Sequence, residues 1–170
     1  MTDRPQSREF RAATAEETRA LGARIATLLG PGDLVVLAGP LGAGKTTLVQ
    51  GLAEGLKVRG PITSPTFVIA RVHPSLSGGP ALVHADAYRI GGALEIDDLD
   101  LDASLAESVT VVEWGEGLVE GLSEDRLEIL IKRFEGEERP AAGVPADAEE
   151  RVIRLTPIGP RWSTTSLTHP

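Results

Sequence analysis

The sequence predicts an α/β fold: one domain with a mixed, partly parallel sheet flanked by helices. In the first part of the chain, short apolar runs rich in β-branched residues alternate with leucines at helical spacing. In the later part, strand patterns follow one another directly. With 170 residues the chain suits a single domain with a core. We assign residues 1–156 to this domain and residues 157–170 to a flexible tail.

The first helix is expected to start at Thr14, because Thr14 and Glu17 have the spacing of a capping box. The residues that follow place four apolar side chains on one helical face: Leu21, Ile25, Leu28 and Leu29. Gly30-Pro31-Gly32 is expected to stop this helix. The next run, DLVVLA at 33–38, is predicted to be a strand buried on both faces, as in a parallel sheet.

A second helix is predicted from the spacing of Leu48, Leu52 and Leu56. Further strands are predicted at residues 67–73, 81–88, 110–114, 126–134 and 151–158. The first two are separated by PSLSGG, whose turn-forming residues predict a hairpin. The last two are predicted to pair with each other. Between them lies a segment, 135–150, that is rich in Pro, Ala and Glu and is expected to be a mobile surface loop.

Composition excludes several kinds of site. The chain has no cysteine, so disulfides, thiolate zinc sites and a cysteine nucleophile are excluded. The first residues are polar and no apolar run approaches the length of a membrane span, so we expect a cytoplasmic protein without a membrane partner. The net charge of −8 argues against broad binding to nucleic-acid phosphates. Any action on RNA is therefore expected to pass through a partner.

Residues 39–46 (GPLGAGKT) match the phosphate-binding pattern G-x-x-x-x-G-K-[ST], between a predicted strand and a predicted helix. Gly39 and Gly44 allow the backbone to wrap closely around an anion, so that N–H groups point at the phosphates. Lys45 is suited to reach the β- and γ-phosphates, and the Thr46 hydroxyl is suited to bind Mg²⁺. The pattern in this context predicts a P-loop NTPase-like domain rather than a glycine turn that only caps a helix.

The nucleotide is predicted to be ATP. A GTPase is expected to carry an N-K-x-D element that recognises guanine, and this chain contains no asparagine. It also lacks a D-x-x-G element.

A P-loop also needs an acid near the metal, usually at the end of a buried strand. Glu113 ends the run TVVE, where a carboxylate would face the nucleotide crevice, and Asp86 follows the apolar run ALVHA, so it too lies near a strand end. Either could hold the metal or position water, or could simply be a solvated strand end or a helix cap. Thr66 is a candidate phosphate or metal sensor, although Ser-Pro-Thr is also a common turn. His73 and His84 lack metal-ligand spacing and are expected to be structural or to face solvent.

In combination, four motifs resemble the TsaE (YjeE) family of bacterial ATPases, which act in making the threonylcarbamoyl modification of tRNA adenosine. The motifs occur in the family's order: LGAGKTT (41–47), SPTF (64–67), HADAYR (84–89) and VEWGE (112–116). Apart from the P-loop each motif is weak, but four in register are specific. The resemblance spans roughly residues 10 to 134, with RVIRL (151–155) as a plausible last strand.

The resemblance implies a slow ATPase that uses ATP and Mg²⁺ and supports turnover of the TsaD–TsaB pair, which transfers the threonylcarbamoyl group to tRNA. It implies catalytic roles for Lys45, Asp86 and Glu113, with Thr46, Asp86 and Glu113 near the metal. The implied nucleotide contacts are Gly42, Ala43, Gly44, Lys45, Thr46, Thr47, Thr66, Trp114 and, near the base, Thr14. One departure is Pro40, which stands where the family often has an acid and removes one N–H from the loop.

Two other function classes fit the same loop. A small-molecule or nucleotide kinase uses the same lysine and metal, but it usually adds an arginine-rich lid, and the arginines here are scattered. A nucleotide-dependent binding module would need Lys45 and Thr46 but not Glu113 or Asp86. The acidic run at 97–102 is either a solvated face or a docking patch for a basic partner.

Overall fold

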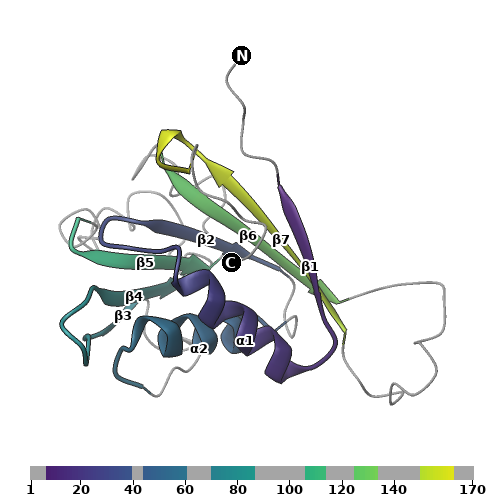
Figure 1. Ribbon diagram of the computed structural model, residues 1–170, viewed down its shortest axis with the longest axis horizontal. Helices are drawn as coiled ribbons and strands as arrows, with labels where there is room; N and C mark the ends of the chain where they lie inside the picture. Colours follow the sequence, from purple (N-terminus) through teal and green to yellow (C-terminus); the bar gives the residue numbers. More distant parts are fainter. Residues whose placement is uncertain are drawn as a thin grey trace.

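The computed structural model describes residues 7–39, 44–60, 70–86, 106–113, 125–133 and 150–162. The strands in this part are β1 (Arg8–Ala12), β2 (Leu34–Ala38), β3 (Ala70–His73), β4 (Ala81–Asp86), β5 (Ser108–Glu113), β6 (Arg126–Arg133) and β7 (Arg151–Ile158). The helices in the same ranges are α1 (Ala15–Ala26), α2 (Lys45–Leu56) and a 3-10 turn at Pro160–Trp162. The described strands form one mixed sheet in the order β1-β7-β6-β2-β5-β4-β3, and α1 and α2 lie on one face of it (Figure 1). The predicted fold class is confirmed.

The centre of the sheet is parallel. Strand β2 pairs in parallel with β5 and β6, and β4 pairs in parallel with β5. Every residue of β2 is buried, as the unbroken apolar run predicts for a strand covered on both faces. Because the four parallel strands share one direction, β2, β4, β5 and β6 all end on the same side, which we call the carboxyl end of the sheet.

The two long helices pack with their backbones in contact. A Cβ added to Gly51 of α2 would overlap the carbonyl oxygen of Arg19 in α1, and one at Gly55 would overlap that of Ala23. Residue numbers rise together along this contact, so the helices run in the same direction. Since α2 follows the end of β2, both helices begin near the carboxyl end of the sheet. No helix in the described ranges is long and apolar enough to span a membrane.

Helix α1 is shorter than predicted. It ends at Ala26 rather than at the Gly-Pro-Gly stop, because the chain tightens into i→i+3 hydrogen bonds there. The Thr27 N–H donates to Arg24 O at 3.1 Å, and the Leu28 N–H donates to Ile25 O at 2.9 Å. Leu28 and its neighbour Leu29 still pack against the core, so the apolar pattern extends beyond the helix itself.

Strand β1 was not predicted. Its sequence, REFRA, is mostly charged, and only its antiparallel pairing with β7 makes it a strand. The pairing places Ala12 beside Arg151. The strand ends at Ala12, two residues before Thr14, the N-cap of α1.

Ordered structure continues past the predicted domain boundary at 156. Pro157 and Ile158 complete β7, and Trp162 is 1% exposed and belongs to the core. The remaining predicted tail, 163–170, lies outside the described residues, as do residues 135–149 of the predicted loop. Parts of the predicted strands also lie outside them: residues 67–69, 87–88, 114 and 134.

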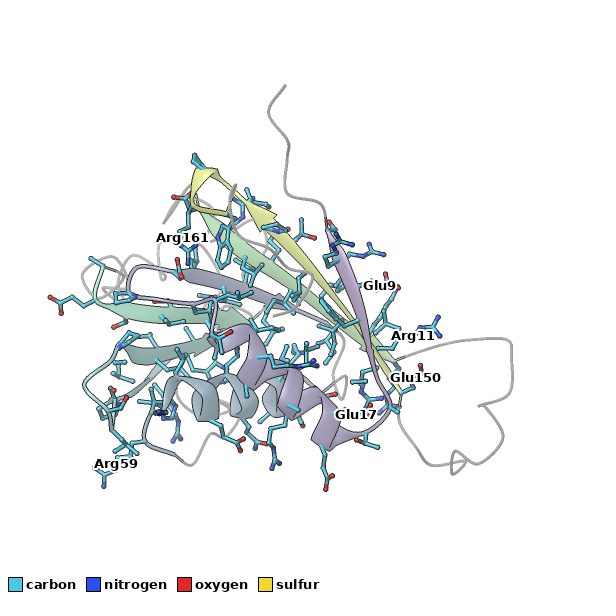
Figure 2. All side chains as sticks on the ribbon, in the orientation of Figure 1. Glu9, Arg11, Glu17, Arg59, Glu150 and Arg161 are labelled. Carbon is cyan, nitrogen blue, oxygen red and sulfur yellow. The ribbon has the colours of Figure 1, made fainter. Side chains whose placement is uncertain are left out.

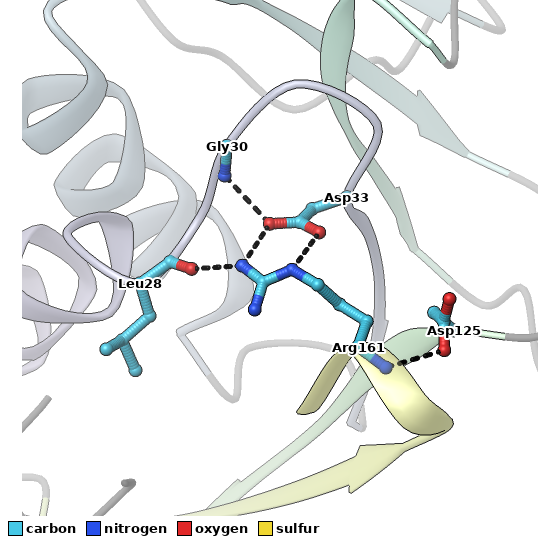
Figure 3. A network of polar contacts seen from close by, with 5 residues as sticks. All are labelled: Leu28, Gly30, Asp33, Asp125 and Arg161. Atoms are coloured by element: carbon cyan, nitrogen blue, oxygen red, sulfur yellow. Dashed lines mark hydrogen bonds and ion pairs between the residues drawn. The ribbon is translucent and has the colours of Figure 1, made fainter. Parts of the chain in front are cut away.

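Arg161 ties this C-terminal segment to the turn before β2 (Figure 3). Its Nε and Nη2 donate to the two carboxylate oxygens of Asp33 at 3.1 and 3.0 Å, and Nη2 also donates to Leu28 O at 2.8 Å. The guanidinium lies 4.4 Å from the Trp162 ring centroid. Such a two-pronged pair adds directional strength to the contact. It lies at the start of β2, opposite the carboxyl end of the sheet.

Candidate functional site

The start of α2 is an open helix N-terminus. Its N-cap is Gly44, in a left-handed conformation with φ of 99°, and no side chain caps it. The first turn contains no acidic residue, and Thr46 and Thr47 are half-buried. The free N–H groups and the positive end of the helix dipole make such a terminus a site for anions. The helix start that the glycine motif predicts is therefore present, whereas residues 40–43 of the loop lie outside the described residues.

Lys45 bends back over the beginning of the loop. Its Nζ donates to Gly39 O at 2.6 Å, and the side chain is largely buried. Gly39 lies next to β6, where a Cβ would overlap the carbonyl oxygen of Ile131. A larger residue at 39 would displace the strand end from which the loop starts, so glycine is required for close packing there.

Glu113 and Asp86 end neighbouring strands at the carboxyl end of the sheet. They are register partners in the β4–β5 pair, and Glu113 is also paired with Leu37, two residues before Gly39. Glu113 is 4% exposed, so it is not a solvated strand end. The side chain of Asp86 lies outside what the structure describes. The two acids thus have the predicted positions, and their roles at a metal stay a prediction.

His84 contacts Glu113 directly. Its Nε2 lies 2.7 Å from Glu113 Oε2, and the histidine is fully buried. We expected His84 to be structural or to face solvent, and did not predict its contact with Glu113. No sequence spacing indicates it, because it depends on the register between β4 and β5.

His73, by contrast, lies outside the site. It belongs to β3, and its Nδ1 lies 3.1 Å from Arg59 O. Burial of the ring lowers the pKa of His73 below its usual 6.5. Its partner is a backbone carbonyl, so it is a structural histidine.

Arg151 is a basic residue of the site that sequence reasoning missed. It is 6% exposed, and an added Cβ at Gly44 would lie 3.5 Å from its Nε. A guanidinium beside the start of α2 adds positive charge where the helix already favours an anion. More than a hundred residues separate Arg151 from Lys45 in the chain, and only the pairing of β7 brings them close.

Thr14 lies at the same end as the start of α2, because the two helices are parallel. It is exposed, and its hydroxyl accepts a hydrogen bond from the Glu17 N–H at 3.1 Å. The Glu17 carboxylate accepts a hydrogen bond from the Ala13 N–H at 2.5 Å. In an ideal capping box the donor would be the Thr14 N–H, one residue later. In Figure 2, Glu17 lies at the same end of the molecule as the Arg11–Glu150 ion pair. The closest nitrogen and oxygen of that pair lie 3.9 Å apart.

Several predicted nucleotide contacts lie outside the described residues: Gly42, Ala43, Thr66 and Trp114. Within the described residues, no three acidic or histidine side chains gather into a metal cage. A hydroxyl at Thr46 and carboxylates at the ends of β4 and β5 fit a different kind of site. Mg²⁺ is commonly held by one or two carboxylates together with substrate phosphates and water.

Comparison with known proteins identifies the family. Residues 12–141 match the family model for the threonylcarbamoyl adenosine biosynthesis protein TsaE. That match includes the residues described above at the carboxyl end of the sheet, among them Gly39, Asp86 and Glu113.

Among curated relatives, the tRNA threonylcarbamoyladenosine biosynthesis protein TsaE of Streptomyces coelicolor is 61% identical, over 88% of this chain and 96% of its own. The protein of the same name from Bacillus subtilis is 37% identical, over 91% of this chain and 88% of its own. The crystal structure of Bacillus subtilis YdiB superposes with a TM-score of 0.69 at 32% identity, covering 92% of this chain and 89% of that one. The chain therefore belongs to the TsaE family.

Proposed function

We propose that this chain binds ATP with Mg²⁺ at the carboxyl end of its sheet and hydrolyses it in support of tRNA threonylcarbamoyladenosine formation. One observation carries the proposal: the uncapped start of α2, with Lys45 in its first turn, follows β2, which is the neighbour of Glu113 in the sheet. An anion site and a buried acid thus meet at one sheet end. The pathway is taken from the names of the relatives.

In this proposal each residue has a physical task. The N–H groups at the start of α2 and the Lys45 ammonium receive the phosphates, and Arg151 adds positive charge beside them. The Thr46 hydroxyl, Glu113 and Asp86 hold the metal or orient its waters. When bound, Mg²⁺ would neutralise charge on the phosphate oxygens. The chain supplies positioning and charge, which are the main needs of phosphoryl transfer.

The partners proposed are TsaD and TsaB, with which this chain would act in the cytoplasm. The relatives are named for tRNA modification, yet the chain itself carries a net charge of −8, which disfavours direct contact with the tRNA backbone. We therefore place tRNA on the transferase pair and ATP on this chain. Slow hydrolysis by the isolated chain, raised by the pair, is the expected behaviour.

The test of the ATPase proposal uses the two acids. Glu113→Ala and Asp86→Ala are each expected to keep measurable ATP binding in calorimetry and to lose most hydrolysis. Glu54→Ala, an exposed acid in α2, is the matched control and should keep both. Full turnover in both acid variants would instead support a binding module in which ATP only sets the conformation.

A kinase remains the second candidate, and Arg151 is the observation that keeps it open. Scattered arginines in the sequence disfavour the arginine-rich lid of a kinase. In the folded chain, however, Arg151 lies beside the start of α2. Arginines at a phosphate site serve kinases as well as ATPases. The product decides between the two: an ATPase releases inorganic phosphate, whereas a kinase forms a phosphorylated acceptor that mass spectrometry of a metabolite mixture would detect.

A further inference from the structure

In the described part of the chain, His84 is the hydrogen-bond partner of the Glu113 side chain. The two residues come from neighbouring parallel strands, and His84 lies two residues before Asp86, the register partner of Glu113. The His84 imidazole therefore lies further from the carboxyl end of the sheet than Asp86 and Glu113, next to the Glu113 carboxylate. Both side chains are at least nine-tenths buried.

The contact restricts the Glu113 carboxylate. The last torsion of a glutamate is normally broad, so an unpaired carboxylate can rotate. If the carboxylate is to bind a metal or orient water it must be ionised, and it then only accepts hydrogen bonds, so in this arrangement Nε2 of His84 is the donor. Because Oε2 is engaged at 2.7 Å, the orientation of Oε1 is also set. That oxygen remains for a metal-bound water or for the water that attacks the phosphate.

Burial of His84 is costly, as is burial of His73, whose Nε2 also has no hydrogen-bond partner among the described residues; the two differ because His84 contacts a carboxylate and His73 a backbone carbonyl. The Nδ1 atom of His84 is buried and has no hydrogen-bond partner in the described part of the chain. A buried polar atom without a partner is destabilising. The flanking residues on the same side of the sheet, Leu82 and Val111, belong to the apolar core. An apolar pair at positions 84 and 113 would avoid the cost of burying polar groups.

We propose that His84 is a positioning residue that orients the Glu113 carboxylate for its task at the metal or the attacking water. This inference rests on the proposed ATPase function and deepens it. His84 touches neither nucleotide nor metal in this account and acts only through Glu113. Groups that orient a metal-site acid in this way commonly change metal affinity or activity about 10- to 100-fold when removed.

The test compares two substitutions that differ in the place of one donor. In His84→Gln the side-chain amide can reach the position of Nε2, whereas in His84→Asn it reaches only that of Nδ1. Three quantities are measured on the full chain: Mn²⁺ affinity with a non-hydrolysable ATP analogue, affinity for the analogue without metal, and kcat. His73→Asn is the matched control, because that buried histidine contacts a backbone carbonyl through Nδ1, the position that an Asn amide can reach.

We expect His84→Asn to lower metal affinity or kcat about 10- to 100-fold. Its metal-free analogue affinity should be unchanged, and His84→Gln should restore most of the loss. A fall in kcat alone would assign Glu113 to the attacking water, and a fall in metal affinity would assign it to the metal. If His84→Asn matches the unmodified chain in both quantities while folded, the pair is only structural and the inference is wrong.

A second readout needs no substitution. The Nε2 proton of His84 should give a slowly exchanging NMR signal that shifts on adding Mg²⁺ with the analogue and not on adding the analogue alone. If the chemical shift of this proton does not change when Mg²⁺ is added with the analogue, the inference is contradicted, even if His84→Asn does not fold. Failure of the underlying function looks different: the unmodified chain would then neither bind nor hydrolyse ATP, and both proposals would fall.

Discussion

Helices α1 and α2 have the same length, run in the same direction and pack on the same face of the sheet, yet their first turns are opposites. The first turn of α1 contains Glu16 and Glu17, and Thr14 caps it. The first turn of α2 follows an uncapped Gly44 and contains Lys45. The two helices present the same backbone dipole to the same end of the molecule.

The difference shows how one physical feature serves two purposes. In α1 the free N–H groups and the positive helix end are satisfied by the chain's own side chains, which stabilises the fold. In α2 no side chain of the described residues caps the start, and the first turn contains no acid that would repel phosphate. The comparison predicts that changes at the start of α1 affect stability, and changes at the start of α2 affect nucleotide binding.

The largest effect is expected for Lys45→Ala. A hydrogen bond to a charged group contributes about 1.5–3 kcal/mol, and Lys45 is assigned contacts to two phosphates. ATP affinity in calorimetry should therefore fall at least about 100-fold, to the point where binding is no longer seen. Lys57→Ala, at the other end of α2, is the matched control. Unchanged affinity in Lys45→Ala would break the comparison and remove the proposed function.

Gly51→Ala is expected to lower the free energy of unfolding by about 1–3 kcal/mol, the usual cost of overpacking. Helix propensity alone predicts the opposite sign, because alanine favours a helix interior by about 1 kcal/mol over glycine. Backbone contact with Arg19 decides the sign here. Gly30→Ala is the control, since an added Cβ there meets nothing within 4 Å. Urea denaturation that found Gly51→Ala stabilising would mean that the helices are not in backbone contact.

Thr14→Ala should lower the free energy of unfolding by about 1 kcal/mol through loss of the cap, and Thr14→Ser should restore it. The same variants test the expectation that Thr14 lies near the base of the nucleotide. A change in ATP affinity beyond the change in stability would give Thr14 both roles. Equal stability of Thr14→Ala and the unmodified chain would show that the cap contributes nothing.

The smallest effects are expected at the other ends of the helices, where glycine should act with opposite sign. Lys57 caps α2 in a left-handed conformation with φ of 57°, which glycine adopts without steric cost. Lys57→Gly should therefore stabilise by up to about 1 kcal/mol. Thr27 caps α1 in a right-handed conformation and donates from its hydroxyl to Arg24 O, so Thr27→Gly should destabilise. Shifts of the same sign in thermal denaturation would contradict this reading of the two caps.

The sequence predicts best those features that depend on local patterns. The unbroken apolar run of β2 predicts burial on both faces, and the glycine motif predicts an open helix start, because each follows from residues close together in the chain. Glu113 could be placed at a strand end for the same reason.

The features that were missed depend on pairing between distant segments. REFRA becomes a strand only beside β7, and Arg151 reaches Gly44 only because β7 returns antiparallel to β6. The contact of His84 with Glu113 follows from the β4–β5 register, which no local pattern determines. The continuation to Trp162 depends on the pairing of Arg161 with Asp33, which lies 128 residues earlier in the sequence.

The most direct test of the central claim is ATP turnover by the purified chain, measured alone and with the TsaD–TsaB pair from the same organism. We predict slow release of inorganic phosphate by the chain alone, a marked increase with the pair, and loss of both in Lys45→Ala. No phosphate release in either condition, or a rate of release that is the same with and without the pair, would contradict the proposed role in tRNA modification.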